Sequence, residues 1–399
     1  MISSAMLPYR HFRQMLSIQA KAAAEKPFLI LPNAGGEALS YAEFNARVHQ
    51  TAHLLHSDLG LRRGDPLGVM GAVDADLLVI VCAAWVVGLT VYPLRSGRPA
   101  PQGCRVVIAQ AEVFDPALAP TVIQVGGRPR GDVPFFHDMV RGLPNTFYSD
   151  EAEPALDDAA LAVASIGEGG RWGQVSMRGL LNGALRLALA QGSLGGQRVI
   201  GTAALDDLAS LSAVILMPLL TGGTVTLLTA FEPGTFWRRV AADRIHSAML
   251  SPAQVEACIA YAQAERSAGR PIFGAGVYQQ DVRGFRHVLS AGLTREQAAG
   301  FSEIYGLPIL HGYCDEALGG FTCLLPLDLD WVEQQRWLRG GAQPSVGVPL
   351  AGVEVEPPQP GQRGTIRFRA DGVERLVEGS CEVDARGRRF YFIEAKEAG

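Results

Sequence analysis

The chain has 399 residues, of which 48% are apolar and 19% are charged, and its formal net charge at pH 7 is −5. Single hydrophobic cores stop growing at about 250–300 residues, so this length predicts two or more lobes. A slightly acidic chain without a basic face argues against nucleic acid or an anionic membrane as a partner.

The first half of the chain predicts alternating helices and strands. Residues 39–61 predict a helix, with Ser40 as its N-cap and Glu43 in the spacing of a capping box. A strand follows in "PLGVMGAV", and residues 77–87 and 89–94 predict the next helix and strand. "RVVIAQ" and "PTVIQV" predict two more short strands. This order of elements is typical of α/β proteins.

The run of residues 77–94 is the most membrane-like part of the chain, but Gly88 and Pro93 interrupt it. It predicts a buried helix that ends near Val87, followed by a short buried strand, rather than a membrane span. The N-terminus has no long apolar core of a secretory signal. Six scattered cysteines without a Cys-x-x-Cys pair favour a reducing compartment and argue against a zinc site. We therefore predict a cytoplasmic protein.

The second half begins with "DDAALAVASIG", a predicted strand that enters a glycine-rich loop, and "MRGLLNGALRLALAQGSL", the predicted helix after it. A helix–glycine–strand pattern recurs in "SLSAVILMPLLTGGTVTLL", and "FRHVLSAG" to "LPILHGY" forms another unit. From about residue 345 the apolar period shifts toward two. We predict an α/β fold, with two α/β lobes of mixed sheets flanked by helices over residues 1–335 and a distorted β-barrel over residues 336–399.

Several segments, taken in order, resemble the adenylate-forming superfamily, which includes acyl- and aryl-CoA synthetases, luciferases and peptide-synthetase adenylation domains. "WVVGLTVYPL" is similar to its Lys-Ala-Gly-aromatic-Val-Pro-Leu segment, and "LMPLLTGGTVTLL" to its Pro-Leu…Gly…Val-Leu segment. "GLPILHGY" resembles the approach to its Tyr-Gly-x-Thr-Glu motif, and "SVGVPLAGVEVE" its Gly-x-Pro-x-x-Gly stretch. The resemblance rests on the collinear set, over roughly residues 25–393, rather than on one motif.

The resemblance implies a large N-terminal domain that, in active members, precedes a mobile domain with a catalytic lysine. The sequence ends where the hinge to that small domain is expected, and "FIEAKEAG" lacks its Gly-Arg signature. We therefore expect the small catalytic domain to be absent.

The glycine loop "SIGEGGRWGQV", residues 165–175, matches the family's Thr-Ser-Gly-Thr-Thr-Gly-x-Pro-Lys-Gly-Val only in part. Gly167 and Gly170 are retained, whereas Glu168 and Gly169 replace the central threonines and no lysine is present. A carboxylate in place of a cation opposes phosphate binding. The degenerate nucleotide site implied by the resemblance consists of five residues: Gly167, Gly169, Gly170, Tyr313 and Ser380.

The other family motifs are also altered. Asp206 falls where a histidine near the reacting carboxylate is expected, and an acid there would repel that carboxylate. Tyr313 matches the Tyr-Gly-x-Thr-Glu motif, but its Thr-Glu pair is not cleanly present, so Asp315 or Glu316 remains a candidate metal ligand. Ser380 replaces the aspartate of the ribose-binding Thr-Gly-Asp. The substrate pocket is predicted from seven residues: Asp206, Leu208, Ala291, Gly292, His311, Gly312 and Cys314.

These losses predict an acyl-CoA synthetase-like pseudoenzyme. It would bind an acyl or aryl carboxylic acid or its thioester, or serve as an accessory subunit beside an active ligase or a carrier protein. No cofactor and no metal are expected.

Two enzymatic alternatives stay open. The chain is an active ATP- and magnesium-dependent acid–CoA or acid–carrier ligase if a small domain acts in trans, with Arg171 as phosphate clamp, Tyr313 in the active site and Glu316 as metal ligand. Alternatively, Cys314 or His311 transfers an acyl group from a preformed thioester. A metal face formed by His49, His53 and His56 is disfavoured, because no further ligand completes it.

Overall fold

The computed structural model describes residues 7–32, 36–95, 99–163, 172–193 and 195–394. The chain divides into two units. The N-terminal unit holds Leu7–Leu181 and Ala203–Asp207, and the C-terminal unit holds Asn182–Thr202 and the residues from Leu208 onward. The predicted boundary between residues 335 and 336 is a finer division of the C-terminal unit, and it stays a prediction.

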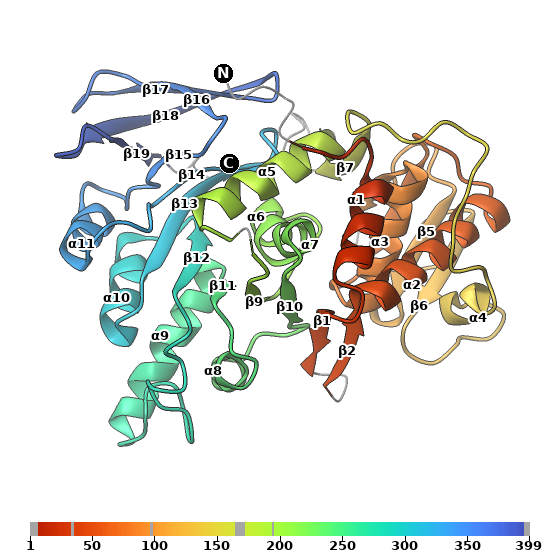
Figure 1. The fold of residues 1–399 in the computed structure, drawn as a ribbon, viewed down its shortest axis with the longest axis horizontal. Coiled ribbons are helices and arrows are strands. Elements are labelled where there is room, and N and C mark those ends of the chain that lie inside the picture. Colours follow the sequence, from red (N-terminus) through yellow and green to blue (C-terminus); the bar gives the residue numbers. More distant parts are fainter. Residues whose placement is uncertain (1–6, 33–35, 96–98, 164–171, 194, 395–399) are drawn as a thin grey trace. The chain divides into compact units, whose positions relative to one another are not determined.

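The N-terminal unit is built on a parallel sheet with one antiparallel edge strand, in the order β6-β5-β3-β4-β7-β8 (Figure 1). Its elements are α1 (Phe12–Ala22), β1 (Pro27–Leu31), β2 (Glu37–Ser40), α2 (Tyr41–His53), the π-helical turn η2 (Leu54–Asp58), β3 (Pro66–Met70), α3 (Ala75–Val87), β4 (Thr90–Pro93), β5 (Val106–Gln110), the 3-10 turn η3 (Ala111–Val113), β6 (Thr121–Val125), α4 (Phe136–Val140), β7 (Ala159–Val163) and β8 (Gly173–Ser176). β1 and β2 form an antiparallel hairpin.

Local sequence signals fix the two main helices of this unit. The predicted capping box at the start of α2 is confirmed, because Ser40 Oγ accepts from the N–H of Glu43 and Glu43 Oε2 accepts from the N–H of Ser40. α3 is buried almost throughout, and it ends at Gly88, whose φ of 88° is left-handed. The predicted helix end at Val87 is therefore confirmed. The helix predicted over residues 39–61 is shorter and continues into η2.

The C-terminal unit carries seven neighbouring strands in the order β10-β9-β11-β12-β13-β14-β15, parallel as far as β13 and antiparallel beyond it. Its further elements are α5 (Met177–Ala190), β9 (Arg198–Gly201), α6 (Leu208–Ser210), the π-helical η5 (Leu211–Leu216), α7 (Met217–Thr221), β10 (Thr224–Leu227), α8 (Pro233–Ala242), β11 (Ser247–Met249), α9 (Pro252–Ser267), β12 (His287–Ala291), α10 (Arg295–Tyr305), β13 (Ile309–Asp315), β14 (Gly320–Leu324), α11 (Trp331–Arg339) and β15 (Val348–Pro349). Helices α9 and α10 lie on one side of these strands, and α6 and α7 on the other (Figure 1).

The C-terminal segment forms a four-stranded antiparallel sheet in chain order: β16 (Glu354–Glu356), β17 (Arg363–Ala370), β18 (Val373–Val383) and β19 (Arg389–Ile393). The predicted α/β fold with a C-terminal β region is thus confirmed. Asp371 and Gly372 form the two-residue turn between β17 and β18, and both have positive φ, as an Asp-Gly hairpin turn requires.

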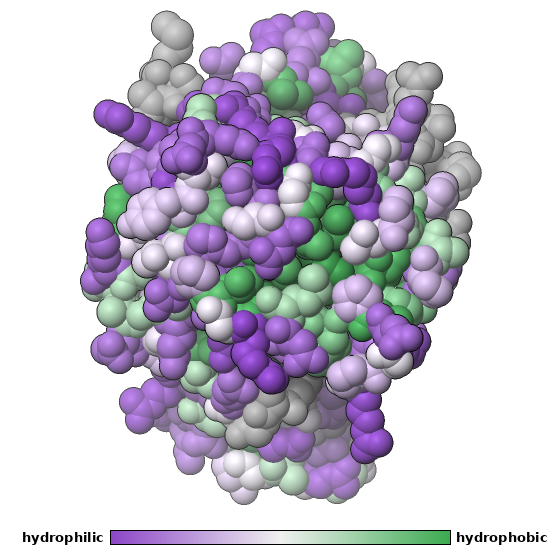
Figure 2. All heavy atoms as spheres, turned by 90° about the vertical axis from the view of Figure 1, so that its right-hand side faces the viewer, coloured by the Kyte–Doolittle hydropathy of each residue, from purple (hydrophilic) through white to green (hydrophobic). Residues whose placement is uncertain are grey.

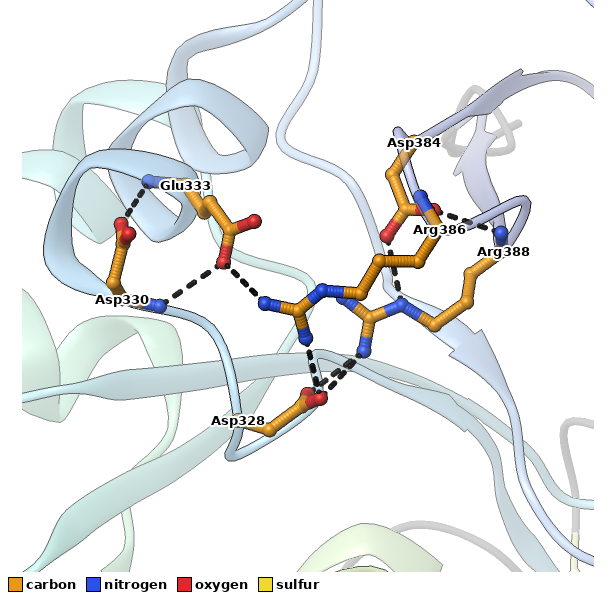
Figure 3. Close-up of polar contacts among 6 residues, drawn as sticks. All are labelled: Asp328, Asp330, Glu333, Asp384, Arg386 and Arg388. Atoms are coloured by element: carbon orange, nitrogen blue, oxygen red, sulfur yellow. Dashed lines mark hydrogen bonds and ion pairs between the residues drawn. The ribbon is translucent and has the colours of Figure 1, made fainter.

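An ion-pair network ties the turn between β18 and β19 to the start of α11 (Figure 3). Arg386 and Arg388 both donate to Asp328, each with an N–O distance of 2.8 Å. Arg388 also donates to Asp384 within its own turn, at 2.7 Å. Glu333, which closes the capping box of α11, lies 3.5 Å from Arg386. The network fixes one end of the antiparallel sheet against the helix.

Candidate functional site

The residues predicted for the phosphate loop, Gly167, Gly169, Gly170 and Arg171, lie outside the described residues. The strands on either side of the loop are described. β7 and β8 pair antiparallel, and Val163 lies opposite Gly173. The loop therefore connects a β-hairpin that leads directly into α5.

Five of the predicted pocket residues come together at the carboxyl end of β12 and β13. These neighbouring strands are parallel, with Ser290 opposite His311 and Ala291 opposite Gly312. Gly292 follows directly, and Cys314 is half-buried near the end of β13. Leu208 begins α6, which packs against β13 and β14. The carboxyl edge of parallel strands is the usual place for a ligand site in an open α/β sheet.

His311 is a buried structural residue rather than an available base. Its Nδ1 lies 3.0 Å from the carbonyl oxygen of Ser345, and its Nε2 lies 3.2 Å from the N–H of Leu293. Nδ1 therefore donates and Nε2 accepts, so both nitrogens of the neutral ring are used. Burial lowers the pKa of His311 to about 4. This geometry gives no support to a catalytic His311.

Asp315 is held by four hydrogen bonds. Its Oδ2 accepts from the Tyr313 hydroxyl at 2.9 Å and from Arg375 Nε at 3.2 Å. Its Oδ1 accepts from the N–H groups of Ala317 and Leu318, at 3.0 and 3.3 Å. A carboxylate has about four acceptor sites, so this set saturates it. Counted from Tyr313, the glutamate position of the Tyr-Gly-x-Thr-Glu motif is Ala317, whose side chain cannot bind a metal.

Tyr313 packs against the C-terminal antiparallel sheet. Its ring lies 5.7 Å from that of Phe368 on β17, and burial raises the pKa of its hydroxyl, which stays protonated and donates to Asp315. Among the described residues, no group of three or more His, Cys, Asp or Glu side chains gathers to hold a metal ion. Asp315, whose acceptor sites are all occupied, therefore does not fit as a magnesium ligand.

A second charged group, which was not predicted from the sequence, lies beside this one. Arg186 on α5 forms an ion pair with Asp371 at the tip of the β17–β18 hairpin, and its Nη1 donates to the carbonyl oxygen of Leu318 at 3.1 Å. Asn182 also donates to Asp371, at 2.7 Å. Two signals were available: an arginine within the apolar "GALRLALA", and an Asp-Gly pair between two alternating segments.

Ser380, the predicted ribose-site residue, lies in β18 between Arg363 on β17 and Phe392 on β19. Two carboxylates of this sheet are already engaged. Arg363 forms a bidentate ion pair with Glu394, and Thr365 donates to Glu378 at 2.7 Å. No charge-assisted partner replaces the missing aspartate among these described contacts.

Asp206, predicted for the substrate pocket, belongs to the N-terminal unit and pairs with Arg95. Arg95 Nε donates to its Oδ2 at 2.6 Å, while the Arg95 side chain remains 77% exposed. The partly buried acid at this position is thus neutralised by an arginine. Its partner is one residue beyond Leu94, the last residue of the "WVVGLTVYPL" segment.

The three histidines of α2 and η2 do not form a metal-binding surface. His49 Nδ1 accepts from the N–H of Phe147 at 3.0 Å, and His53 Nε2 lies 2.7 Å from the carbonyl oxygen of Thr146. His56 lies 3.4 Å from the Ser149 hydroxyl. They hold the segment around Phe147 against the helix, so their role in the structure is packing.

Residues 16–113 and 174–375 match the AMP-binding enzyme family, so more than half of the chain is covered. The chain belongs to the AMP-binding enzyme family. It is 29% identical over 364 residues to feruloyl-CoA synthases from an Amycolatopsis and a Streptomyces species, covering 88% of this chain and 69% of those proteins. The predicted resemblance to adenylate-forming enzymes is confirmed.

Solved structures share the fold at low identity. The anthranilate CoA ligase AuaEII, solved with anthranoyl-AMP, has a TM-score of 0.76 at 14% identity, over 98% of this chain and 79% of the ligase. The N-terminal domain of FACL13 from Mycobacterium tuberculosis has a TM-score of 0.75 at 15% identity, over 97% of this chain and 100% of that domain. The chain thus has the fold of the N-terminal domain of these ligases. None of its described helices is both long and apolar enough to span a membrane.

Proposed function

We propose that this protein is a ligase-like member of the AMP-binding enzyme family that has lost adenylation and binds an aryl or acyl carboxylic acid, or its CoA thioester. It acts as a binding or accessory subunit beside an active ligase or a carrier protein. The predicted cytoplasmic location is part of this proposal.

The saturated carboxylate of Asp315 carries the proposal. Adenylation requires cations and donors around the phosphates of ATP. Here the acid after Tyr313 binds Arg375, a hydroxyl and two N–H groups instead of a metal. Replacing Arg375 with a hydrated magnesium ion would break the contact that holds this turn to β18. Arg375 thus supplies the positive charge beside Asp315 that a bound metal ion would otherwise supply.

Two other features support the same conclusion. The glycine loop contains Glu168 and no lysine, so Arg171 is the one cation that residues 165–175 offer to the departing pyrophosphate. Asp206 places a carboxylate, paired with Arg95, where the family has a histidine. A substrate carboxylate there would meet this ion pair in place of an imidazole.

The sequence relatives suggest the ligand class. Feruloyl-CoA synthases, by their name, act on an aryl acid with an unsaturated side chain, and these proteins match most of this chain. We therefore choose ferulate and feruloyl-CoA as probes. A saturated fatty acid such as octanoate serves as the comparison, because it tests whether an aromatic ring is needed.

The first experiment is calorimetric titration of the folded chain with Mg·ATP and, separately, with AMP. We expect no heat of binding from either nucleotide at millimolar concentration. Binding in the micromolar range that is lost in Arg171→Ala would overturn the proposal in favour of the ligase that borrows its small domain. Glu168→Ala is the matched loop variant, and under that outcome it should bind ATP more tightly.

The second experiment is thermal unfolding with ferulate, feruloyl-CoA or octanoate in the absence of ATP. Binding to the native state alone raises the melting temperature, by an amount that grows with ligand concentration. We expect stabilisation by ferulate or its thioester and release of no pyrophosphate when ATP and CoA are added. Pyrophosphate release that depends on ferulate would contradict the loss of adenylation.

A further inference from the structure

Basic side chains cross the amino ends of three neighbouring strands of the C-terminal unit, β9, β11 and β12 (Figure 1). Arg198 begins β9, and His246 and Arg286 directly precede β11 and β12. The N–H of His246 donates to the carbonyl oxygen of Arg198 at 2.8 Å, and the N–H of Arg286 to that of His246 at 2.7 Å. The registers of both strand pairs align the three residues, so their side chains point to the same face. We call them the basic row, which is about 10 Å long at a strand spacing of about 4.8 Å.

The two arginines of the basic row have no acid partner among the described residues, although many arginines of this chain form ion pairs. Arg198 is half-buried and donates from Nη1 to the backbone carbonyl oxygen of Asp243 at 2.6 Å, whereas Arg286 is exposed. The carboxylate of Asp243 is already occupied, by Arg239 at 2.6 Å and by the hydroxyl of Thr226 at 2.9 Å. The charges of both row arginines are therefore available to a ligand.

Two further arginines extend this positive charge. Arg244 and Arg283 lie in the segments that lead into β11 and β12, both are exposed, and neither pairs with a described carboxylate. Arg244 has a φ of 52°, a left-handed backbone that residues other than glycine seldom adopt. Asp281 is the one acid between α9 and β12, and it accepts from the N–H of Tyr278. Positive charge is thus in excess at this edge of the sheet, although the whole chain carries a net charge of −5.

His246 lies between the two arginines as a neutral ring. Its Nδ1 accepts from the N–H of Arg198 at 2.9 Å, so the hydrogen of the neutral ring is on Nε2. Burial lowers the pKa of His246, and the charges of Arg286 and Arg198 lower it further. At the end of α8 the charges of Asp243 and Arg239 offset each other, and η5, which also packs against β11, has no titratable side chain. A bound anion would therefore favour protonation of His246, because it offsets the two neighbouring arginines.

We propose that the basic row binds an acidic segment of a partner polypeptide. Its cations are spaced along a line, so a small anion gains only one or two exposed ion pairs, which are individually weak. A segment with several carboxylates forms these pairs together, and each further pair then forms within the complex. Side chains on one side of an extended chain repeat at about 7 Å, so two carboxylates fit along the row and others reach Arg244 and Arg283. A long polyanion such as nucleic acid would also meet the net negative charge of the rest of the chain.

The surface of the N-terminal unit offers a different chemistry. Figure 2 views the side on which β5 and β6 lie in Figure 1, and it shows hydrophobic residues in the middle with hydrophilic residues around them. Carboxylates placed on that apolar centre would lose hydration without gaining a cation. An acidic segment is therefore expected at the basic row rather than there.

The basic row and the predicted pocket lie at opposite ends of β12. The row precedes the strand, whereas Ala291 ends it and Gly292 follows. A partner on the row would leave the carboxyl ends of the strands open to a ligand. The partner's role as a neighbouring ligase or carrier protein rests on the proposed function. Binding of an acidic segment requires neither ATP nor an acyl ligand, so its failure is distinguishable from failure of the proposed function.

The test uses a labelled ten-residue peptide in which glutamate alternates with serine, and fluorescence anisotropy measures its binding to the full chain. We expect a dissociation constant of roughly 100 µM at low ionic strength, and at least about fivefold weaker binding of the same peptide with glutamine in place of glutamate. Binding should be about threefold tighter at pH 6 than at pH 8, because His246 becomes protonated while the glutamates stay ionised. His246→Gln should remove this pH dependence.

Arg244→Gln/Arg286→Gln should weaken binding of the acidic peptide at least about tenfold, because it removes two exposed cations. Arg389→Gln is the matched control: Arg389 is exposed in β19, has no described carboxylate partner and lies outside the row, so binding should not change. Circular dichroism confirms folding of each variant. Absence of binding at about 1 mM, or equal affinity for the glutamate and glutamine peptides, overturns the proposal. So does tighter binding of a ten-nucleotide oligothymidylate than of the acidic peptide, because the row then recognises phosphates.

Discussion

The guanidinium of Arg186 on α5 and the carboxylate of Asp371 at the tip of the β17–β18 hairpin form a nearly buried ion pair. The two side chains are only 4% and 18% exposed. Arg186 also binds the carbonyl oxygen of Leu318, and Asp315 three residues earlier binds Arg375 on β18. The hairpin therefore fixes both α5 and the turn after β13 through charges of its own, in the region where the family motifs predict a nucleotide.

Breaking this pair on one side should destabilise the protein strongly. Asp371→Asn leaves the buried Arg186 charge without its anion, while asparagine still tolerates the left-handed backbone of the turn. Removing one partner of a buried pair costs about 3–5 kcal/mol of unfolding free energy. Thermal and urea unfolding measure the loss.

The double variant Arg186→Met/Asp371→Asn provides the control. Because it removes both charges, it should be more stable than Asp371→Asn alone. Losses of Arg186→Met and Asp371→Asn that simply add in the double variant would show that the two side chains do not interact across the hairpin.

The fold was largely predictable because its signals are local. The capping box at Ser40 and the glycine end of α3 at Gly88 act within one helical turn, and the structure has both. From about residue 345 apolar residues recur at every second position, and this pattern predicted the antiparallel sheet of β16 to β19. Such features depend on neighbours in the sequence, so a single sequence contains them.

The candidate site was less predictable because its contacts join distant residues. Motif spacing drew attention to Tyr313, Asp315 and Glu316, but the partner of Asp315 is Arg375, sixty residues later. Similarly, Arg186 meets Asp371 across 185 residues. Local patterns show that a buried arginine needs a partner, and they do not show which acid supplies it. The predicted pocket residues on β12 and β13 did meet, because adjacent parallel strands align their carboxyl ends.

Lowering the pH should destabilise the protein already at pH values above those at which carboxylates become protonated. Burial lowers the pKa of His49, His287 and His311 to about 4 each, from an ordinary value of 6.5. The unfolded chain therefore binds protons at these sites before the folded chain does, so stability is full above pH 6.5 and falls as the pH drops toward 4. At pH 5 the loss is roughly 2 kcal/mol per histidine.

Melting temperatures between pH 8 and pH 5 test this dependence. His311→Asn should be less stable at pH 8 but show a flatter decline toward pH 5, because one buried titration is gone. His137 is the control of opposite sign: its hydrogen bond to Asp76 raises its pKa, so its stabilisation is present in acid and is lost as the pH rises. His137→Gln should steepen the acid decline, and a flatter profile in that variant would contradict the assignment.

Two glycines inside helices of the C-terminal unit should respond oppositely to alanine. In α5, a Cβ on Gly183 would lie 2.1 Å from the carbonyl oxygen of Gly319, which is backbone and cannot rotate away. In α10, a Cβ on Gly300 would meet only Ile259 Cδ1, at an ordinary 3.6 Å. Alanine in an open helix position stabilises by about 0.5–1 kcal/mol relative to glycine.

We therefore expect Gly300→Ala to raise the unfolding free energy by up to about 1 kcal/mol, and Gly183→Ala to lower it by about 1–3 kcal/mol. The Gly183 variant must also shift α5 from the turn at Gly319, which carries the carbonyl of Leu318 bound by Arg186. Its cost should consequently shrink in the background of Arg186→Met, where that contact is already lost. Equal effects of alanine at Gly183 and Gly300, measured by urea unfolding, would show that α5 does not approach this turn closely.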